Sequence, residues 1–182
     1  IARPPAPRTT TREIPALMEY GKAQVRELLT NYGKIDVFFI DGPADGLREQ
    51  AWESQPDIVV TRGAIETPEQ HVPGIPMDQA WEACITIGSA WQHKPADVPK
   101  SSTELIQTLL EIRAKGGNLL LNFGPRPDGT FAEGEAKVAR AMGEWLRKYG
   151  DAIYGTRGGP YRNGSWGGSC HRGDKLFLHV YQ

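Results

Sequence analysis

The sequence predicts an α/β fold built around a parallel sheet, and two observations lead to this prediction. Short continuous apolar segments alternate along the chain with stretches whose apolar residues recur at helical spacing. The apolar segments are also rich in β-branched and aromatic residues, as strands are when both faces of a sheet are covered. Strands that alternate with helices form parallel sheets, because each helix returns the chain to the end where the previous strand began.

Each element follows from its own pattern. Helices show apolar residues three and four positions apart, whereas strands show uninterrupted apolar runs. Ser101 or Ser102 with Glu104 forms a capping box before one helix, and Gly116-Gly117 ends that helix. The predicted elements are a helix over 11–31, a strand over 35–40, a short helix over 46–55, a strand over 57–61, a Pro-rich loop over 62–80, a strand over 81–88, a helix over 101–117, a strand over 118–123 and a helix over 132–149.

The last part of the chain has a different composition. Residues 155–169 are Gly-rich, and residues 174–182, "DKLFLHVYQ", alternate apolar and polar side chains like a strand that has no partner after it. We therefore expect residues 1–156 to form the α/β part. Residues 157–182 are expected to be a linker and the first strand of a separate β domain.

Composition and charge argue against several classes of function. The chain has 182 residues and a net charge of −1, so it lacks the basic excess typical of proteins that bind nucleic acid or anionic membranes. No apolar run approaches the ~20 residues that span a bilayer. Cys84 and Cys170 fit no metal-ligand spacing and are expected to be two free thiols, although a disulfide stays open. The five Trp residues suit surfaces that stack flat ligands or sugar faces.

Charged and aromatic side chains gather near the ends of the predicted strands. In a parallel sheet, chemistry takes place outside the carboxyl ends of the strands, where the loops converge. Two carboxylates that face a sugar are the usual apparatus for cleaving a glycosidic bond, so this pattern predicts a hydrolase that uses carboxylates. The residues concerned are Asp41 and Arg62 at two strand ends, Glu66, Glu69 and His71 in the next loop, Glu82 at the start of the third strand, Trp91 and His93 after it, and Asn122 at the end of the fourth.

Each of these residues also has a purely structural interpretation, which the sequence leaves open. Asp41 suits an Asx turn in "DGPADG", and Arg62 suits a surface ion pair with a nearby acid. Glu69 follows Thr67-Pro68 and suits the first turn of a helix, while the histidines suit ordinary loop positions. Glu82 is harder to explain in this way, because an acid inside a buried strand would lack a partner.

Six motifs, taken in order, carry a family resemblance: "YGKIDVFFIDG", "VVTRG", "ETPEQ", "WEACITIGSAW", "KGGNLLLNFGPRPDG" and "GEWLRKYGDAIYGT". Together they resemble the alpha-L-fucosidases of glycoside hydrolase family 29 from about residue 19 to residue 156. The resemblance implies a partial (β/α) TIM-like barrel of about four βα units, followed by the start of a C-terminal β-sandwich. It also implies release of terminal alpha-linked L-fucose from oligosaccharides or glycoconjugates, with retention, by double displacement and without a metal or other cofactor.

The resemblance assigns roles to four of the residues. Asp41 matches the nucleophile, which explains an acid at the tip of a buried strand. Arg62 matches an arginine that contacts the sugar and keeps the nucleophile ionised. Phe39 matches an aromatic residue that lines the pocket, and Trp91 matches one that contacts the C6 methyl group of fucose.

The acid/base residue is less clearly marked by the resemblance. Glu69 and Glu82 both lie where family members place this residue. We favour Glu69, because a carboxylate on a mobile loop can approach the leaving oxygen from outside, and we keep Glu82 as its competitor. Whichever acts needs a raised pKa to be protonated near neutral pH. Glu66 is taken as a substrate-binding residue.

Parts of the family pattern are missing from this chain. Residues 1–34 contain no His and no Trp, although the family's fucose pocket uses such residues from earlier strands. We therefore expect the chain to be the C-terminal half of a fucosidase barrel, inactive alone although its parent is active. The alternatives are a non-catalytic, carbohydrate-binding or decayed half-barrel and another retaining glycosidase such as a galactosidase. Family members are often secreted, periplasmic or lysosomal, so the compartment is not predicted.

Overall fold

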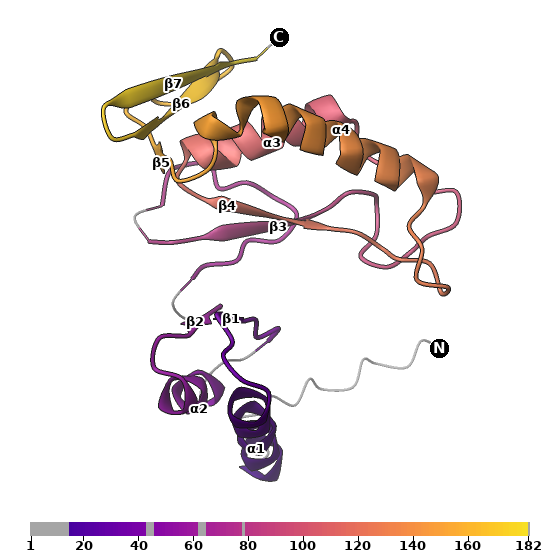
Figure 1. Cartoon of the computed structure of the whole chain (residues 1–182), viewed down its shortest axis with the longest axis vertical. Helices are drawn as coiled ribbons and strands as arrows, with labels where there is room; N and C mark the ends of the chain where they lie inside the picture. The colour runs from indigo at the N-terminus through magenta and orange to yellow at the C-terminus, as the bar shows by residue number, and fades with distance from the viewer. Residues whose placement is uncertain (1–14, 43–45, 62–64, 78, 182) are drawn as a thin grey trace, which may run out of the picture. The chain divides into compact units, whose positions relative to one another are not determined.

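The structure, a computed structural model, describes residues 15–42, 46–61, 65–77 and 79–181. The chain divides into two units, residues 1–66 and residues 67–182, and each is described by itself (Figure 1). The elements of the first unit are α1 (Pro15–Asn31), β1 (Val37–Phe38), α2 (Leu47–Ser54) and β2 (Val59–Val60). Those of the second are β3 (Glu82–Thr86), α3 (Ser102–Ala114), β4 (Asn118–Asn122), α4 (Glu133–Tyr149), the short 3₁₀ helix η2 (Gly150–Ala152), β5 (Arg157–Gly158), β6 (Gly167–Arg172) and β7 (Lys175–Val180).

In the first unit a short parallel strand pair packs with two helices. Strands β1 and β2 share two residue pairs, Val37 with Val59 and Phe38 with Val60. The predicted strands over 35–40 and 57–61 therefore exist, but their regular pairing is shorter than expected. Their apolar side chains join those of α1 and α2 in one core, whose buried members are Val25, Leu29, Ile40, Ala51, Ile58 and Val60.

The second unit contains a longer parallel pair. Strands β3 and β4 are in register from Glu82 opposite Asn118 to Thr86 opposite Asn122. Helices α3 and α4 lie on the same side of this pair (Figure 1). Trp81, Ala83 and Ile85 from the β3 region pack with Ile112 of α3, and a second cluster joins Ile87, Leu105 and Met142.

Helix α3 begins and ends as its sequence predicts. The Ser101 side chain accepts a hydrogen bond from the backbone N–H of Glu104 at 3.1 Å, so Ser101 is the N-cap. Gly116 follows the helix with a φ of 85°, a conformation that glycine adopts without steric cost. The chain can therefore leave α3 and enter β4 within a few residues.

The C-terminal residues form an antiparallel three-stranded sheet in the order β5-β6-β7. The predicted strand over 174–182 is confirmed as β7, but its partner β6 lies in the Gly-rich stretch that was expected to be a linker. The glycines allow close contact there: a Cβ atom on Gly167 would lie 1.7 Å from the His179 carbonyl oxygen, and one on Gly168 would lie 2.6 Å from Ala114 Cβ of α3. The domain boundary near residue 156 and the separate β domain stay predictions.

Two further expectations concern the chemistry of the chain. Neither Cys84 nor Cys170 is in a disulfide, as expected, and Cys170 is buried. Among the helices that the structure describes, none has both the length and the apolar character needed to cross a bilayer.

The complete barrel and the sandwich stay predictions, because the described residues form two parallel strand pairs and one antiparallel sheet.

Candidate active site

Asp41 lies three residues beyond the end of strand β1 and directly follows buried Ile40. Side chains alternate between the two faces of an extended chain, so Phe39 and Asp41 share the face opposite to Ile40. Both are solvent-exposed, Phe39 to 43%. Phe39 and Asp41 also line the same hollow of about 300 Å³ beside α1. The predicted nucleophile and the predicted pocket aromatic are thus neighbours on one accessible surface.

The strand end that carries Asp41 is held by the Thr61 side chain. The backbone N–H of Thr61 donates to the Phe38 carbonyl at 3.1 Å, as in a parallel ladder. The next bond is different, because the backbone N–H of Ile40 donates to the Thr61 hydroxyl oxygen at 3.1 Å. Thr61 is only 2% exposed, so this hydrogen bond is shielded from water. A buried hydroxyl therefore fixes the residue that precedes Asp41.

Two other predicted site residues belong to the first unit. Arg62, the predicted sugar-contacting arginine, lies outside the described residues. Glu66 is exposed and is the last residue of this unit.

Glu69 lies in the second unit, on a segment that runs beside β3. It forms an isolated parallel bridge with Cys84. The Cys84 N–H donates to the Pro68 carbonyl at 3.0 Å, and the Gln70 N–H donates to the Cys84 carbonyl at 2.8 Å. The predicted loop is thus tied to β3 here, because the backbone on both sides of Glu69 is hydrogen-bonded to Cys84. Its side chain is nevertheless exposed.

Glu82 is the first residue of β3 and pairs with Asn118, the first residue of β4. The loop that carries Trp91 follows the other end of β3, about 13 Å further along an extended strand. The structure therefore does not bring Glu82 to the carboxyl edge, where the sequence argument grouped it. Partial burial raises the pKa of the Glu82 carboxyl, which is the direction that a proton donor needs.

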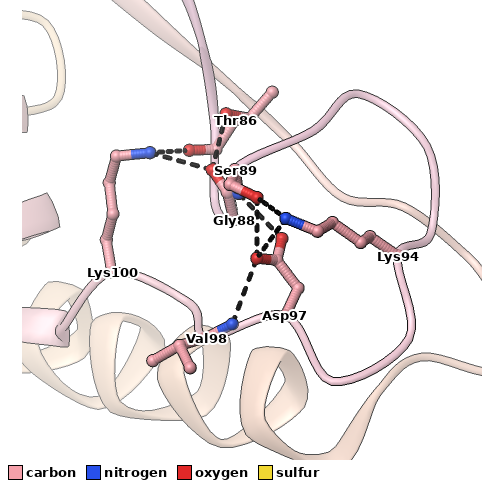
Figure 2. Close-up of polar contacts among 7 residues, drawn as sticks. All are labelled: Thr86, Gly88, Ser89, Lys94, Asp97, Val98 and Lys100. Atoms are coloured by element: carbon pink, nitrogen blue, oxygen red, sulfur yellow. Dashed lines mark hydrogen bonds and ion pairs between the residues drawn. The ribbon is translucent and has the colours of Figure 1, made fainter.

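The Trp91 loop, residues 87–100, connects β3 to α3 and is closed at its base by Asp97 (Figure 2). The Asp97 carboxylate accepts hydrogen bonds from the Ser89 N–H at 2.7 Å and the Ser89 hydroxyl at 2.8 Å. It also accepts one from the Val98 N–H at 3.1 Å, and Lys94 Nζ lies 3.9 Å from it. We call these four residues the Asp97 clasp. Trp91 lies within the closed loop and is 41% exposed.

Atoms of the Trp91 loop lie close to two glycines, Gly88 and Gly124, at which no side chain would fit. A Cβ atom on Gly88 would lie 2.3 Å from an Asp97 carboxylate oxygen, and one on Gly124 would lie 2.5 Å from the backbone nitrogen of His93. Ala96 has a φ of 59°, which is unfavourable for a residue with a side chain. The hydrogen bond from the Ser89 N–H, followed by that from its hydroxyl, lowers the pKa of Asp97. The carboxylate is therefore the form that closes the loop.

Lys100 supports the same loop from the α3 side. Its ammonium group donates to the Thr86 carbonyl at 2.7 Å and to the Gly88 carbonyl at 3.1 Å (Figure 2). The Thr86 hydroxyl also donates to the Gly88 carbonyl, at 2.8 Å. These bonds satisfy the carbonyls at the carboxyl end of β3, so the loop begins from a fixed point. No group of three or more His, Cys, Asp or Glu side chains in the described part of the chain could hold a metal ion.

Comparison with known proteins now identifies the family. A family model described as alpha-L-fucosidase matches residues 5–151, which is most of the chain. The chain belongs to the alpha-L-fucosidase family. The resemblance of the six motifs is thereby confirmed.

Individual relatives agree with this family. Plasma alpha-L-fucosidase of Homo sapiens is 38% identical over 92 residues, which are 48% of this chain and 20% of that protein. The alpha-L-fucosidase of Branchiostoma floridae is 36% identical over 99 residues, which are 52% of this chain and 21% of that protein. The matched region thus spans about one fifth of these curated fucosidases.

Solved structures cover more of the chain. Alpha-L-fucosidase isoenzyme 1 from Paenibacillus thiaminolyticus matches with a TM-score of 0.83 and 29% identity, over 97% of this chain and 49% of that one. A family 29 alpha-L-fucosidase from Bacteroides thetaiotaomicron, trapped as a covalent intermediate with 2-fluoro-fucosyl fluoride, matches with a TM-score of 0.82 and 23% identity, over 94% and 49%. The fold is therefore that of about half of a fucosidase chain.

Sequence reasoning missed two residues that shape the site, Thr61 and Asp97. Thr61 ends a predicted strand, but no sequence pattern indicates that its hydroxyl accepts a hydrogen bond from the Ile40 N–H. Asp97 lies in a Lys-Pro-Ala-Asp turn, and such acids often bond nearby backbone N–H groups. The sequence therefore indicates a turn at Asp97, but it does not indicate that Ser89, eight residues earlier, is the hydrogen-bond partner.

Proposed function

We propose that this chain forms the C-terminal half of the catalytic domain of a retaining alpha-L-fucosidase and contributes its nucleophile. Family membership is the observation that carries the proposal. The exposed Asp41 at the end of β1 supports it, since a carboxylate at the carboxyl end of a parallel strand is where a nucleophile is expected. Its substrate is a glycan that ends in alpha-linked L-fucose.

The reaction proceeds in two displacements. Asp41 attacks the anomeric carbon, the glycosidic bond breaks, and a general acid protonates the leaving oxygen, which leaves a fucosyl ester on Asp41. In the second displacement, the residue that acted as general acid now acts as general base and removes a proton from water. The water oxygen attacks the anomeric carbon, which releases fucose and restores the Asp41 carboxylate. The covalent intermediate trapped in the Bacteroides fucosidase supports this route.

Two exposed aromatic residues, one in each unit, would provide the apolar part of recognition. Phe39 shares its exposed face with Asp41, and Trp91 lies in the loop that the Asp97 clasp closes. An exposed indole suits the apolar C6 methyl group of fucose, which distinguishes this sugar from galactose. We propose Arg62 and Glu66 as further substrate-binding residues.

Two carboxyl groups compete for the acid/base role. Glu69 is exposed and beside the middle of β3, which supports access to a leaving group. Glu82 has the raised pKa of a proton donor, but it lies at the amino end of the strand. We favour Glu69, because a general acid must reach the leaving oxygen and the Glu69 side chain is exposed.

The decisive experiment measures nitrophenol release from 4-nitrophenyl alpha-L-fucoside by the complete protein that contains this sequence. We expect Asp41→Ala to lower kcat/KM by several orders of magnitude and azide to restore part of the rate as fucosyl azide. The matched control is Asp36→Ala, which removes an exposed acid that pairs with Lys34 before the same strand and should leave the rate unchanged. A wild-type protein that binds fucose without turnover would instead support the carbohydrate-binding alternative.

A second pair of variants assigns the acid/base residue. Glu69→Gln and Glu82→Gln are compared on an activated aryl fucoside and on a natural fucoside. The acid/base variant should lose far more rate on the natural substrate, because a good leaving group needs no protonation. Equal losses on both substrates by Glu69→Gln would contradict our preference for Glu69.

A further inference from the structure

The second unit contains a cavity of about 530 Å³ at the amino ends of β3 and β4. Trp81 precedes β3 and Asn118 begins β4, and both line this cavity. Its other side is formed by the end of α3 and by the segment that begins with β5, which lies beside that helix end (Figure 1). The volume is within the range of small-molecule sites in proteins. The Trp91 loop follows the opposite, carboxyl end of β3.

Three arginines line this cavity, and none of them pairs with a carboxylate of the described residues. Arg113 comes from the last turn of α3, Arg157 from β5, and Arg162 from the segment between β5 and β6. Within the part of the chain that the structure describes, none of the three forms an ion pair, and no Asp or Glu lines the cavity. Among the described residues, the three guanidinium charges at this cavity are therefore not balanced by a carboxylate.

Arg113 shows the strongest sign of a missing partner. Its Nε atom is buried and has no hydrogen-bond partner among the described residues, while Nη1 only reaches Asn118 Oδ1 at 3.4 Å. Burial lowers the pKa of Arg113, and the like charge of Arg157, which lines the same cavity, lowers it further. A buried guanidinium N–H without an acceptor is costly, and a bound anion would remove that cost.

Lys115 provides the contrast on the same cavity wall. Its ammonium group contacts Glu111 at 2.5 Å and the Pro73 carbonyl at 2.6 Å, so its charge is satisfied within the protein. The negative end of the α3 dipole favours Arg113 at its position, but Arg157 and Arg162 lie outside any helix. The helix therefore does not explain why three arginines share one cavity.

We propose that this cavity binds a tetrahedral oxyanion of the sulfate or phosphate type, either free or carried on a sugar. Guanidinium groups bind such anions through paired N–H donors, and three around one cavity suit an anion with several acceptor oxygens. Tyr161 on the cavity wall is 56% exposed and could stack on an attached sugar ring, and Asn163 adds an amide. This inference does not depend on the fucosidase reaction.

The test is a binding titration of the complete protein with sodium sulfate at constant ionic strength, with sodium chloride as the reference salt. We expect saturable binding by calorimetry and a matching rise in Tm, since a ligand of the folded state stabilises it. Arg113→Met should weaken binding by roughly tenfold or more, as the loss of a charge-assisted hydrogen-bond donor predicts. Arg140→Gln, which removes an exposed arginine of α4 outside the cavity, should bind sulfate like wild type.

A second variant keeps the test valid if Arg113→Met fails to fold. Arg157→Gln with Arg162→Gln changes two exposed arginines and should also weaken sulfate binding while leaving the Tm without sulfate unchanged. Equal sulfate affinity in this double variant and in wild type, or no saturable binding by wild type, would overturn the proposal.

Two further arms separate the source of the anion and the role of the site. Galactose 6-sulfate that binds more tightly than inorganic sulfate and phosphate would identify a sugar-borne ligand, and the reverse order would identify a free ion. Asp41→Ala should keep wild-type sulfate binding, so a failure of the fucosidase proposal would leave this result intact. Sulfate binding that disappears in Asp41→Ala would contradict a site built from these arginines.

Discussion

In the two parallel strand pairs of this chain, different kinds of side-chain hydrogen bond order the segment that follows the strand. Strands β1 and β2 share two residue pairs, and the buried hydroxyl of Thr61 holds the last residue before Asp41. Strands β3 and β4 share a five-residue register, and a carboxylate beyond the strand, Asp97, closes the loop that carries Trp91.

The difference shows how ladder length decides which side chains matter. A short ladder supplies few backbone hydrogen bonds, so one buried side-chain bond has a large share in placing the next residue. The longer β3–β4 ladder supplies more backbone hydrogen bonds, and the loop that follows it is ordered by its own side-chain bonds. We therefore expect changes at Thr61 to act on the strand and changes at Asp97 to act on the loop.

The largest effect is expected from Thr61→Val, which keeps the shape of the side chain but removes the hydroxyl. The Ile40 N–H would be buried without an acceptor, so the free energy of unfolding should fall by about 1–3 kcal/mol. If Asp41 is the nucleophile, its displacement should also lower kcat by roughly tenfold to a hundredfold. Denaturant unfolding and fucoside kinetics of the complete protein measure the two effects.

The control for this variant is Thr61→Ser, which keeps the hydroxyl and removes only the methyl group. It should retain most of the activity, because the acceptor for the Ile40 N–H remains. Equal kcat values for the Val and Ser variants would show that the hydroxyl does not position Asp41.

A smaller effect is expected from Asp97→Asn, which replaces a carboxylate oxygen that accepts N–H bonds with an amide that donates them. The Trp91 loop should loosen, so KM for an aryl fucoside should rise several-fold, while kcat changes less because Asp41 lies on another strand. The matched control is Asp128→Asn, because Asp128 accepts similar bonds from the Thr130 N–H and hydroxyl in a different turn. Similar kinetic changes in both variants would contradict a specific role for the clasp.

Asp97 also predicts a pH dependence for the loop. Its pKa is lowered in the folded protein, so its stabilising contribution is present above the pKa of an unfolded aspartate and is lost as the pH falls through the folded value. Protection of the loop amides against hydrogen exchange should therefore decrease in acid relative to that of β3. Unchanged relative protection down to pH 3 would argue against the carboxylate as the closing group.

The smallest effect is expected from Glu82→Gln. Its pKa is raised in the folded protein, so the protonated carboxyl is favoured, and this preference lowers stability once the pH rises through the folded value. The Gln variant should be more stable than wild type at pH 7, by less than about 1 kcal/mol because water screens the partly exposed group, and equal to it in acid. Unfolding curves at pH 4 and pH 7 measure the difference, and a less stable variant at pH 7 would contradict it.

Much of the local structure could be predicted because its signals are local. The Ser101 cap, the Gly116 exit and the helices all depend on residues within one or two turns of each other. The β6 strand was missed for the opposite reason. Its glycines are typical of linkers in sequence, but they are required because β7 and α3 approach its backbone closely.

The site was predicted unevenly for a related reason. The sequence by itself determined that Asp41 ends an apolar strand, that Trp91 follows another strand, and that the motifs are those of fucosidases, because these facts depend on residue type and order. Only the tertiary structure decided that Thr61 holds the Asp41 strand, that Asp97 closes the Trp91 loop, and that three arginines share a cavity. Those facts depend on atoms that are far apart in the sequence and that packing brings within hydrogen-bonding distance. No pattern of residue types along the chain indicates which of these atoms will meet.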